Sequence, residues 1–181
     1  HRGLERAIQY ATALNVPSVN ILAGKQPLDS GLLPCLNTLS SNLKLACHRL
    51  SDHHIQPVFE MINSTDMPRF LVQNIAQAQE MLEAVQHPAL KMQYDCYHMA
   101  MMGEDVLEAL KENIHDIGHI QFADCPGRHE PDTAQIHFAE IFQWLNQSAY
   151  SGYIAAEYRP QAHSSHSFAW KDKYFAKHPQ S

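Results

Sequence analysis

Apolar residues in this chain follow two repeats that alternate along the sequence. The first residues show a helical repeat, with one apolar face formed by Leu4, Ala7, Ile8, Ala11 and Leu14. A short apolar run closed by a glycine, residues 17–24, then predicts a buried strand. The helical repeat recurs four more times, and each time it precedes a short apolar run that ends in one polar residue. The predicted helices cover residues 32–52, 71–85, 105–114 and 136–146, and the strands after them end at Glu60, Asp95, Gln121 and Glu157.

This alternation of helix and strand predicts an α/β fold with a parallel sheet. Either an open doubly wound sheet or a (β/α)8 barrel has this order of elements. An open nucleotide-binding sheet usually has a glycine-rich turn after its first strand, and no GxGxxG sequence occurs here, so the barrel is favoured. A complete TIM barrel has eight units and roughly 250 residues. The five units found predict an incomplete barrel in a single domain over residues 1–181, and we expect three more units, roughly 80 residues, before His1.

Composition and charge exclude some classes of binding partner. With 181 residues, of which 45% are hydrophobic and 18% charged, the chain is long enough to bury a core. The net charge of −6 and the lack of any Lys or Arg run argue against nucleic acid and against an anionic membrane surface as partners. The four widely spaced cysteines and the lack of a long apolar run predict a reduced, cytoplasmic protein. In an incomplete barrel, the aromatic last segment (Phe168, Trp170, Tyr174) would expose an apolar surface that could drive association between copies.

The four polar strand ends predict a metal site. The carboxyl ends of parallel strands face a common crevice, so side chains distant in sequence can converge there. Glu60, Asp95, Gln121 and Glu157 would supply three carboxylates and one amide. Oxygen donors of this kind favour Mg²⁺ or Mn²⁺ over Zn²⁺, so we expect a divalent metal as cofactor.

Two glutamates on different strands also suit proton transfer on a hydroxy carbonyl compound. A metal that holds adjacent substrate oxygens acidifies the carbon-bound proton and stabilises the resulting enediolate. One glutamate can remove this proton, and the same or the opposite glutamate can return it to the neighbouring carbon. The pattern therefore predicts an aldose–ketose type isomerase or an epimerase, with Glu60 and Glu157 as the acid–base pair.

Five segments resemble the hydroxypyruvate isomerase family, a member of the xylose isomerase-like TIM-barrel superfamily. They are FEMIN at 59–63, QYDCYHM at 93–99, GHIQFAD at 118–124, PGRHEP at 126–131 and EYRP at 157–160. The resemblance runs through the chain in order and implies interconversion of hydroxypyruvate and tartronate semialdehyde (2-hydroxy-3-oxopropanoate). It also implies residue roles: metal ligation by Glu60, Asp95, Gln121 and Glu157, catalysis by Glu60 and Glu157, and a substrate contact by His98. Arg128 and His129, in the PGRHEP segment, are further candidate substrate-binding residues.

Other functions remain open at this point. Residues 132–136 (DTAQI) stand where the family usually has a glycine-rich stretch, so substrate preference is in doubt, and a 2-oxo-tetronate isomerase or a ketose epimerase is the alternative. The substrate carboxylate could be bound by Arg128 or by Lys25. A zinc endonuclease of the same superfamily is disfavoured by the glutamine at position 121 and by the lack of a basic groove. A truncated, inactive binding or interaction module is the alternative outside enzymes.

Overall fold

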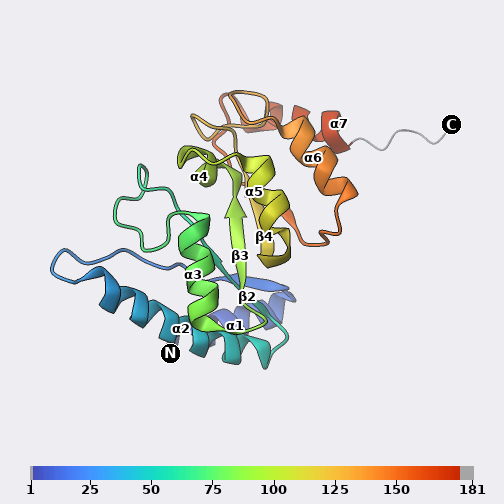
Figure 1. Ribbon diagram of the computed structural model, residues 1–181. Coiled ribbons are helices and arrows are strands. Elements are labelled where there is room, and N and C mark those ends of the chain that lie inside the picture. Colours follow the sequence, from blue (N-terminus) through green and yellow to red (C-terminus); the bar gives the residue numbers. More distant parts are fainter. Residues whose placement is uncertain (1, 176–181) are drawn as a thin grey trace. The chain divides into compact units, whose positions relative to one another are not determined.

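The computed structural model describes residues 2–175, and the predicted alternation of helices and strands is confirmed (Figure 1). Five strands form one sheet in chain order, β1-β2-β3-β4-β5, and the pairs β1–β2, β2–β3 and β4–β5 are parallel. The elements are α1 (Arg2–Leu14), β1 (Ser18–Asn20), α2 (Leu32–Ser51), β2 (Gln56–Glu60), α3 (Ile75–Val85), β3 (Lys91–Asp95), α4 (Cys96–Met101), α5 (Val106–Asn113), the 3₁₀ helix η1 (Ile114–Asp116), β4 (Ile117–Phe122), α6 (Phe138–Gln147), β5 (Ile154–Ala156), η2 (Ser164–His166) and α7 (Ala169–Phe175).

The chain forms two compact units, and the boundary between them passes through β3 and β4. The first unit contains residues up to Tyr94 together with Asp116–His119. The second unit contains Asp95–His115 and the residues from Ile120 onward. That the whole chain forms a single domain stays a prediction.

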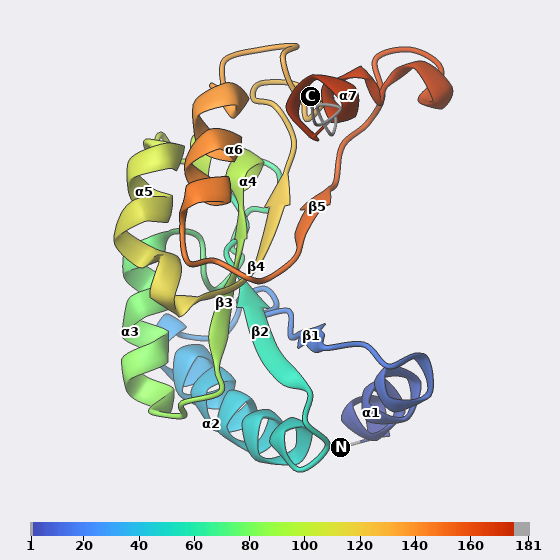
Figure 2. The ribbon, with the colours of Figure 1, turned by 90° about the vertical axis from the view of Figure 1, so that its right-hand side faces the viewer.

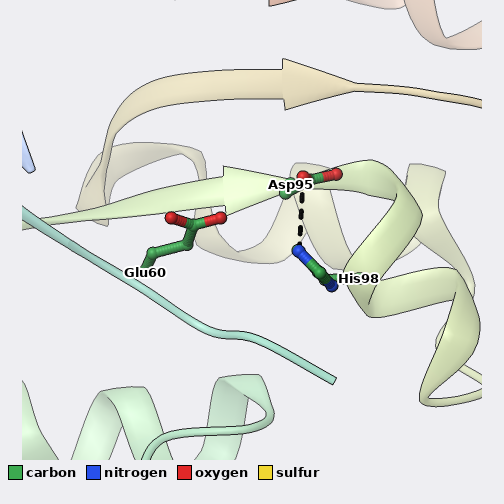
Figure 3. Close-up of side chains that lie close together, drawn as sticks. All are labelled: Glu60, Asp95 and His98. Atoms are coloured by element: carbon green, nitrogen blue, oxygen red, sulfur yellow. Dashed lines mark ion pairs between the residues drawn. The ribbon is translucent and has the colours of Figure 1, made fainter. Parts of the chain in front are cut away.

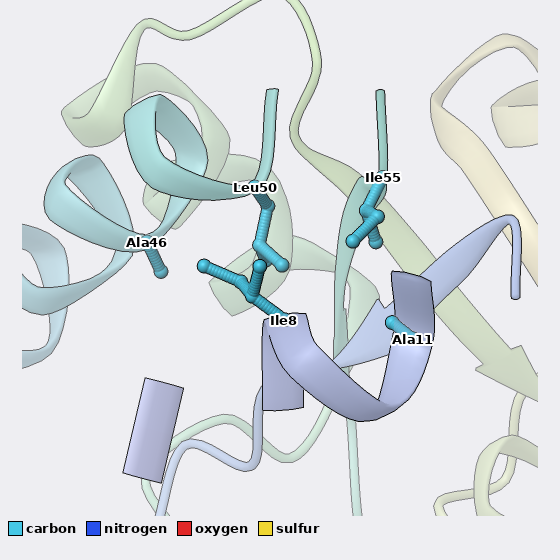
Figure 4. Close-up of a cluster of buried hydrophobic side chains, with 5 residues drawn as sticks. All are labelled: Ile8, Ala11, Ala46, Leu50 and Ile55. Atoms are coloured by element: carbon cyan, nitrogen blue, oxygen red, sulfur yellow. The ribbon is translucent and has the colours of Figure 1, made fainter. Parts of the chain in front are cut away.

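The core of the first unit lies where α1 and α2 meet the start of β2. Ile8 and Ala11 of α1, one helical turn apart, pack with Ala46 and Leu50 of α2 and with Ile55 (Figure 4). In addition, α2 packs against β2 and α3 (Figure 2). Within residues 2–175, no helix combines the length and the apolar character that crossing a membrane requires.

The strand register of the first unit fixes where Glu60 lies. Val58 pairs with Lys91 and Glu60 pairs with Gln93, so β2 and β3 reach the same level of the sheet. Gly118 at the start of β4 lies so close to these strands that an added Cβ would be 2.8 Å from the Lys91 Cβ and 2.9 Å from a Val58 methyl. A glycine is therefore required at position 118 for the strands to pack at this distance.

The second unit has an aromatic core. Phe122 of β4 packs edge-on against Phe142 of α6 and Trp170 of α7, with ring centroids 5.2 and 5.1 Å apart. Tyr174 of α7 also contacts Phe142. The last aromatic segment is thus largely packed, although Phe168 stays exposed. Helix α5 begins at its N-cap Asp105, whose carboxylate accepts hydrogen bonds from two backbone N–H groups.

Several element boundaries differ from the sequence prediction. β4 extends past Gln121 to Phe122, and β5 ends at Ala156, so Glu157 follows its strand instead of ending it. β1 covers three residues and not the predicted 17–24. α3 begins at Ile75 and not near Leu71, because Asn74 caps it and because Leu71 and Val72 form backbone hydrogen bonds with Gly24 and Ile62. The six-residue helix α4 was not predicted, since it is too short to show a helical repeat.

Candidate active site

Glu60 ends β2 with its side chain buried. Its Oε2 accepts hydrogen bonds from the Asn20 amide at 2.8 Å and from the Gln93 amide at 3.0 Å. Asn20 ends β1, and Gln93 is the register partner of Glu60 on β3, so the donors come from the two neighbouring strands. Because amides are neutral, they orient the carboxylate without cancelling its charge.

Asp95 ends β3 and is fully buried. Its Oδ1 accepts a hydrogen bond from the backbone N–H of Tyr97 at 2.8 Å and so caps α4. Among the residues that the structure describes, no donor forms a hydrogen bond with Oδ2. Burial raises the pKa of Asp95 to about 6, although Arg128 and the Tyr97 N–H act in the opposite direction. A buried carboxylate oxygen without a donor is costly, and it is available to a cation.

His98 lies on the first turn of α4 and is also buried. Its Nε2 is 3.8 Å from Asp95 Oδ2, an ion-pair distance that is too long for a hydrogen bond (Figure 3). The imidazole also contacts the Tyr97 ring, with centroids 5.3 Å apart. The helix begun by Asp95 therefore places an imidazole beside the Asp95 carboxylate.

Arg128 brings a positive charge to two of the predicted ligands. Its Nη2 is 3.2 Å from Glu157 Oε1 and 3.6 Å from Asp95 Oδ2. The guanidinium carbon lies 5.1 Å from the centroid of the Tyr97 ring, within cation–π distance. One guanidinium between two carboxylates leaves a net charge of about −1 when both are ionised, which favours a further cation.

Gln121 lies in β4, and Glu157 directly follows β5, the strand that pairs with β4. Gln121 is the register partner of Ala155, and side chains two positions apart on a strand point to the same face. Glu157 follows Ala155 by two positions, and its N–H continues the ladder with a 3.0 Å hydrogen bond to the Phe122 carbonyl. The Glu157 side chain is half-exposed. Both residues thus belong to the carboxyl ends of their strands, as the sequence indicates.

The remaining predicted binding residues are His129 and the alternative cation Lys25. His129 Nδ1 lies 2.7 Å from the Arg159 carbonyl oxygen. A carbonyl only accepts, so Nδ1 carries a proton and donates it to this hydrogen bond. Lys25 is exposed and belongs to the first unit. Within the second unit, the structure brings Arg128 beside Asp95 and Glu157.

Several site residues escaped the sequence analysis. Asn20 and Gln93 orient Glu60, and the available signal was their position: Asn20 follows an apolar run, and Gln93 precedes Asp95 by two positions on one strand. Tyr97, which contacts both His98 and Arg128, directly precedes His98 in the QYDCYHM segment.

Comparison with known proteins establishes the family. The family model described as "Xylose isomerase-like TIM barrel" matches residues 1–174. This chain belongs to that family. Its fold class is thereby confirmed as the xylose isomerase-like TIM barrel, of which five parallel-sheet strands are present.

Curated relatives of this xylose isomerase-like chain carry two isomerase names. A 2-oxo-tetronate isomerase of Cupriavidus necator is 33% identical over 172 residues, which are 95% of this chain and 66% of the relative. A putative hydroxypyruvate isomerase of Danio rerio is 36% identical, with 96% and 65% coverage. The hydroxypyruvate isomerase of Escherichia coli K12 is 35% identical, with 95% and 67% coverage. The chain thus spans about two thirds of the length of these relatives.

Solved structures agree with this family assignment. The structure titled AP endonuclease, family 2, from Brucella melitensis superimposes with a TM-score of 0.90 at 26% identity, covering 94% of this chain and 66% of that one. A 3-keto-D-glucoside 4-epimerase from E. coli superimposes with a TM-score of 0.80 at 20% identity, covering 95% and 70%. At this identity the epimerase shows the shared fold alone.

Proposed function

We propose that this chain carries the metal-binding and acid–base residues of an isomerase that interconverts hydroxypyruvate and tartronate semialdehyde. The observation that supports this most strongly is the Asp95 carboxylate, which is buried at a strand end with Oδ2 lacking a hydrogen-bond donor among the described residues. The relatives named hydroxypyruvate isomerase, at 35–36% identity, indicate the reaction class. The proposed ligands are Glu60, Asp95, Gln121 and Glu157.

The donor set fits a divalent cation. Asp95 is buried, its pKa is raised, and its Oδ2 lies 3.6 Å from Arg128 Nη2 and 3.8 Å from His98 Nε2, so the binding of a cation would compensate for the burial of its charge. Three carboxylates and an amide are hard oxygen donors, which suit Mg²⁺ or Mn²⁺. When bound, the ion would hold the C2 and C3 oxygens of the substrate and acidify the proton on C3, the carbon that carries the hydroxyl group.

The proton transfer itself is proposed for the two glutamates. One carboxylate takes a proton from C3 of hydroxypyruvate, and a carboxylate then delivers a proton to C2, while the hydroxyl proton passes from the C3 oxygen to the C2 oxygen. The amides of Asn20 and Gln93 hold Glu60 in one orientation, which reduces the reorganisation that the transfer needs. Glu157 lies at the end of β5 and is half-exposed, as a group that must reach a substrate should be.

Arg128 is the proposed anchor of the substrate carboxylate. Its guanidinium has planar, paired N–H donors that match a carboxylate. It already lies between two carboxylates, and the Tyr97 ring supports it. His98 is proposed to donate a hydrogen bond to a substrate oxygen, and His129 to contribute Nε2 at the rim.

A second substrate is supported by one observation. The Cupriavidus necator relative is named 2-oxo-tetronate isomerase and is about as similar to this chain, at 33% identity, as the hydroxypyruvate isomerases. A four-carbon acid has the same hydroxy-oxo group and carboxylate, so the proposed residues would act on it in the same way.

A coupled assay tests the proposal. The chain is freed of metal with chelator and then supplied with Mg²⁺ or Mn²⁺, and the formation of tartronate semialdehyde from hydroxypyruvate is followed with an aldehyde-specific reductase. We expect turnover that depends on the metal. Equal or faster turnover of 2-oxo-tetronate would show that this four-carbon acid, and not hydroxypyruvate, is the preferred substrate. No turnover of either acid by metal-loaded chain would refute it in favour of an inactive binding module.

A further inference from the structure

Asp124 is fully buried two residues beyond β4, and its carboxylate is saturated by backbone donors. Its Oδ1 accepts hydrogen bonds from the N–H groups of Cys125 at 2.8 Å and Ile136 at 3.0 Å. Its Oδ2 accepts hydrogen bonds from those of Thr133 at 3.0 Å and Ala134 at 2.8 Å. One side chain therefore joins the start and the end of the loop formed by residues 125–136.

The same residue also forms the turn that carries Arg128. The Asp124 N–H donates to the His129 carbonyl at 2.8 Å, and the Arg128 N–H donates to the Asp124 carbonyl at 3.0 Å. Arg128 has φ +58° and Gly127 has φ +105°, so the turn uses left-handed backbone that a free chain seldom adopts at an arginine. The surrounding hydrogen bonds must therefore hold Arg128 in this conformation.

The segment after β5 holds the outer side of the loop. The Arg159 N–H donates to the Arg128 carbonyl at 2.8 Å, and the Gln161 N–H donates to the Glu130 carboxylate at 3.0 Å. The backbone on both sides of Arg128 is thus fixed. Its guanidinium nevertheless extends away from the loop to Asp95 and Glu157.

We propose that Asp124 is a positioning residue that shapes loop 125–136 so that Arg128 is presented to a substrate carboxylate. The inference rests on the proposed role of Arg128 as the carboxylate anchor. Asp124 acts through the backbone, because all its carboxylate contacts are with loop N–H groups and none is with another site residue. Its loss should therefore weaken substrate binding more than it slows proton transfer.

The test is a double-mutant cycle between Asp124→Asn and Arg128→Gln. Replacing Asp124 with Asn places an amide NH₂ against two backbone N–H groups, which opens the loop. We expect each single variant to raise the KM for hydroxypyruvate at least about tenfold while kcat changes less than about threefold. The double variant should be no worse than Arg128→Gln alone. Additive effects in the double variant would overturn the proposal.

Two activity-free measurements separate this inference from the proposed function. Limited trypsin digestion should cut the Arg128–His129 bond at least about tenfold faster in Asp124→Asn than in the wild type, because cleavage requires local opening of the loop. Pyruvate, which lacks the 3-hydroxyl group and cannot isomerise, should bind about equally weakly to both single variants in an NMR titration. Unchanged cleavage, or unchanged pyruvate affinity in Asp124→Asn, would overturn the inference even if the wild type had no isomerase activity.

Two further variants complete the design. Asp132→Asn is the matched control: Asp132 lies in the same loop but is exposed and contacts Lys173 and Tyr174 instead of loop N–H groups, so its KM and trypsin cleavage should match the wild type. If Asp124→Asn does not fold, Asp124→Glu replaces it in the cycle. Glutamate keeps the charge and adds one methylene, so a smaller rise in KM in the same direction is expected, and a KM equal to the wild type would overturn the proposal.

Discussion

Asp95 and Asp124 are both fully buried aspartates near strand ends of the second unit, and their surroundings differ sharply. Four backbone N–H groups saturate the carboxylate of Asp124. Within the described residues, Asp95 Oδ2 has no hydrogen-bond donor, and it lies 3.6 Å from Arg128 Nη2 and 3.8 Å from His98 Nε2. Burial alone therefore does not mark a ligand. The balance of donors separates a carboxylate that organises a loop from one that is available to a cation.

Substitution of the two proposed acid–base residues should reduce activity more than any other proposed substitution. Glu60→Gln and Glu157→Gln each keep the shape of the side chain and remove its basicity, so kcat for hydroxypyruvate should fall by about 10²–10⁴-fold. The thermal midpoint should stay close to that of the wild type, because the proposed role of these carboxylates is in catalysis and not in stabilising the fold. Steady-state kinetics and thermal unfolding of the same preparations check this. Near-normal turnover in either variant would refute its acid–base role.

Asp124→Asn should strongly destabilise the fold. It leaves two backbone N–H groups facing an amide donor in a buried place, which costs roughly 2–4 kcal/mol of unfolding free energy. Urea unfolding of metal-free protein at pH 7 measures this. A loss below about 0.5 kcal/mol would mean that the four hydrogen bonds do not hold the loop.

Unlike Asp124→Asn, Asp95→Asn should increase the free energy of unfolding of metal-free protein at neutral pH. The folded pKa of Asp95 is raised from 3.8 to about 6, so the folded state binds the proton more tightly than the unfolded state does. That stabilising contribution is complete below pH 4 and is lost as the pH rises through about 6. Relative to the wild type, the variant should therefore gain stability between pH 4 and 7, by up to about 3 kcal/mol. Urea unfolding in chelator at pH 4 and pH 7 tests the sign. A variant less stable than the wild type at pH 7 would show that the Asp95 charge is already compensated.

The smallest expected effect is that of Asp132→Asn. Asp132 is exposed and forms an ion pair with Lys173, whose side chain is 57% exposed. Exposed pairs contribute about 0–1 kcal/mol, so unfolding free energy should change by less than about 1 kcal/mol. A loss as large as that of Asp124→Asn would show that loop 125–136 depends on its outer contacts and not on Asp124.

The strand ends could be predicted from sequence because the pattern that marks them, an apolar run followed by one polar residue, lies within a few consecutive residues. In the structure, Glu60, Asp95 and Gln121 lie in their strands as predicted, and Glu157, which was predicted to end its strand, directly follows β5. The orienting amides of Asn20 and Gln93 were not predicted, since they become meaningful only once the register Glu60–Gln93 is known. Asp124 was missed for another reason. Its partners are backbone N–H groups up to twelve positions later, and a backbone N–H group is present at nearly every residue, so the sequence does not indicate which ones bind Asp124. The catalytic and ligand roles stay predictions.

Binding of Mn²⁺, followed by electron paramagnetic resonance of the free ion, tests whether Asp95 is a metal ligand. The matched pair is Asp95→Asn and Asp116→Asn: Asp116 is an exposed aspartate paired with Lys91 at 3.6 Å and lies before β4. We expect wild type and Asp116→Asn to bind one Mn²⁺ per chain with the same affinity, and Asp95→Asn to bind it at least about tenfold more weakly. Equal Mn²⁺ affinity in Asp95→Asn and the wild type would contradict the account.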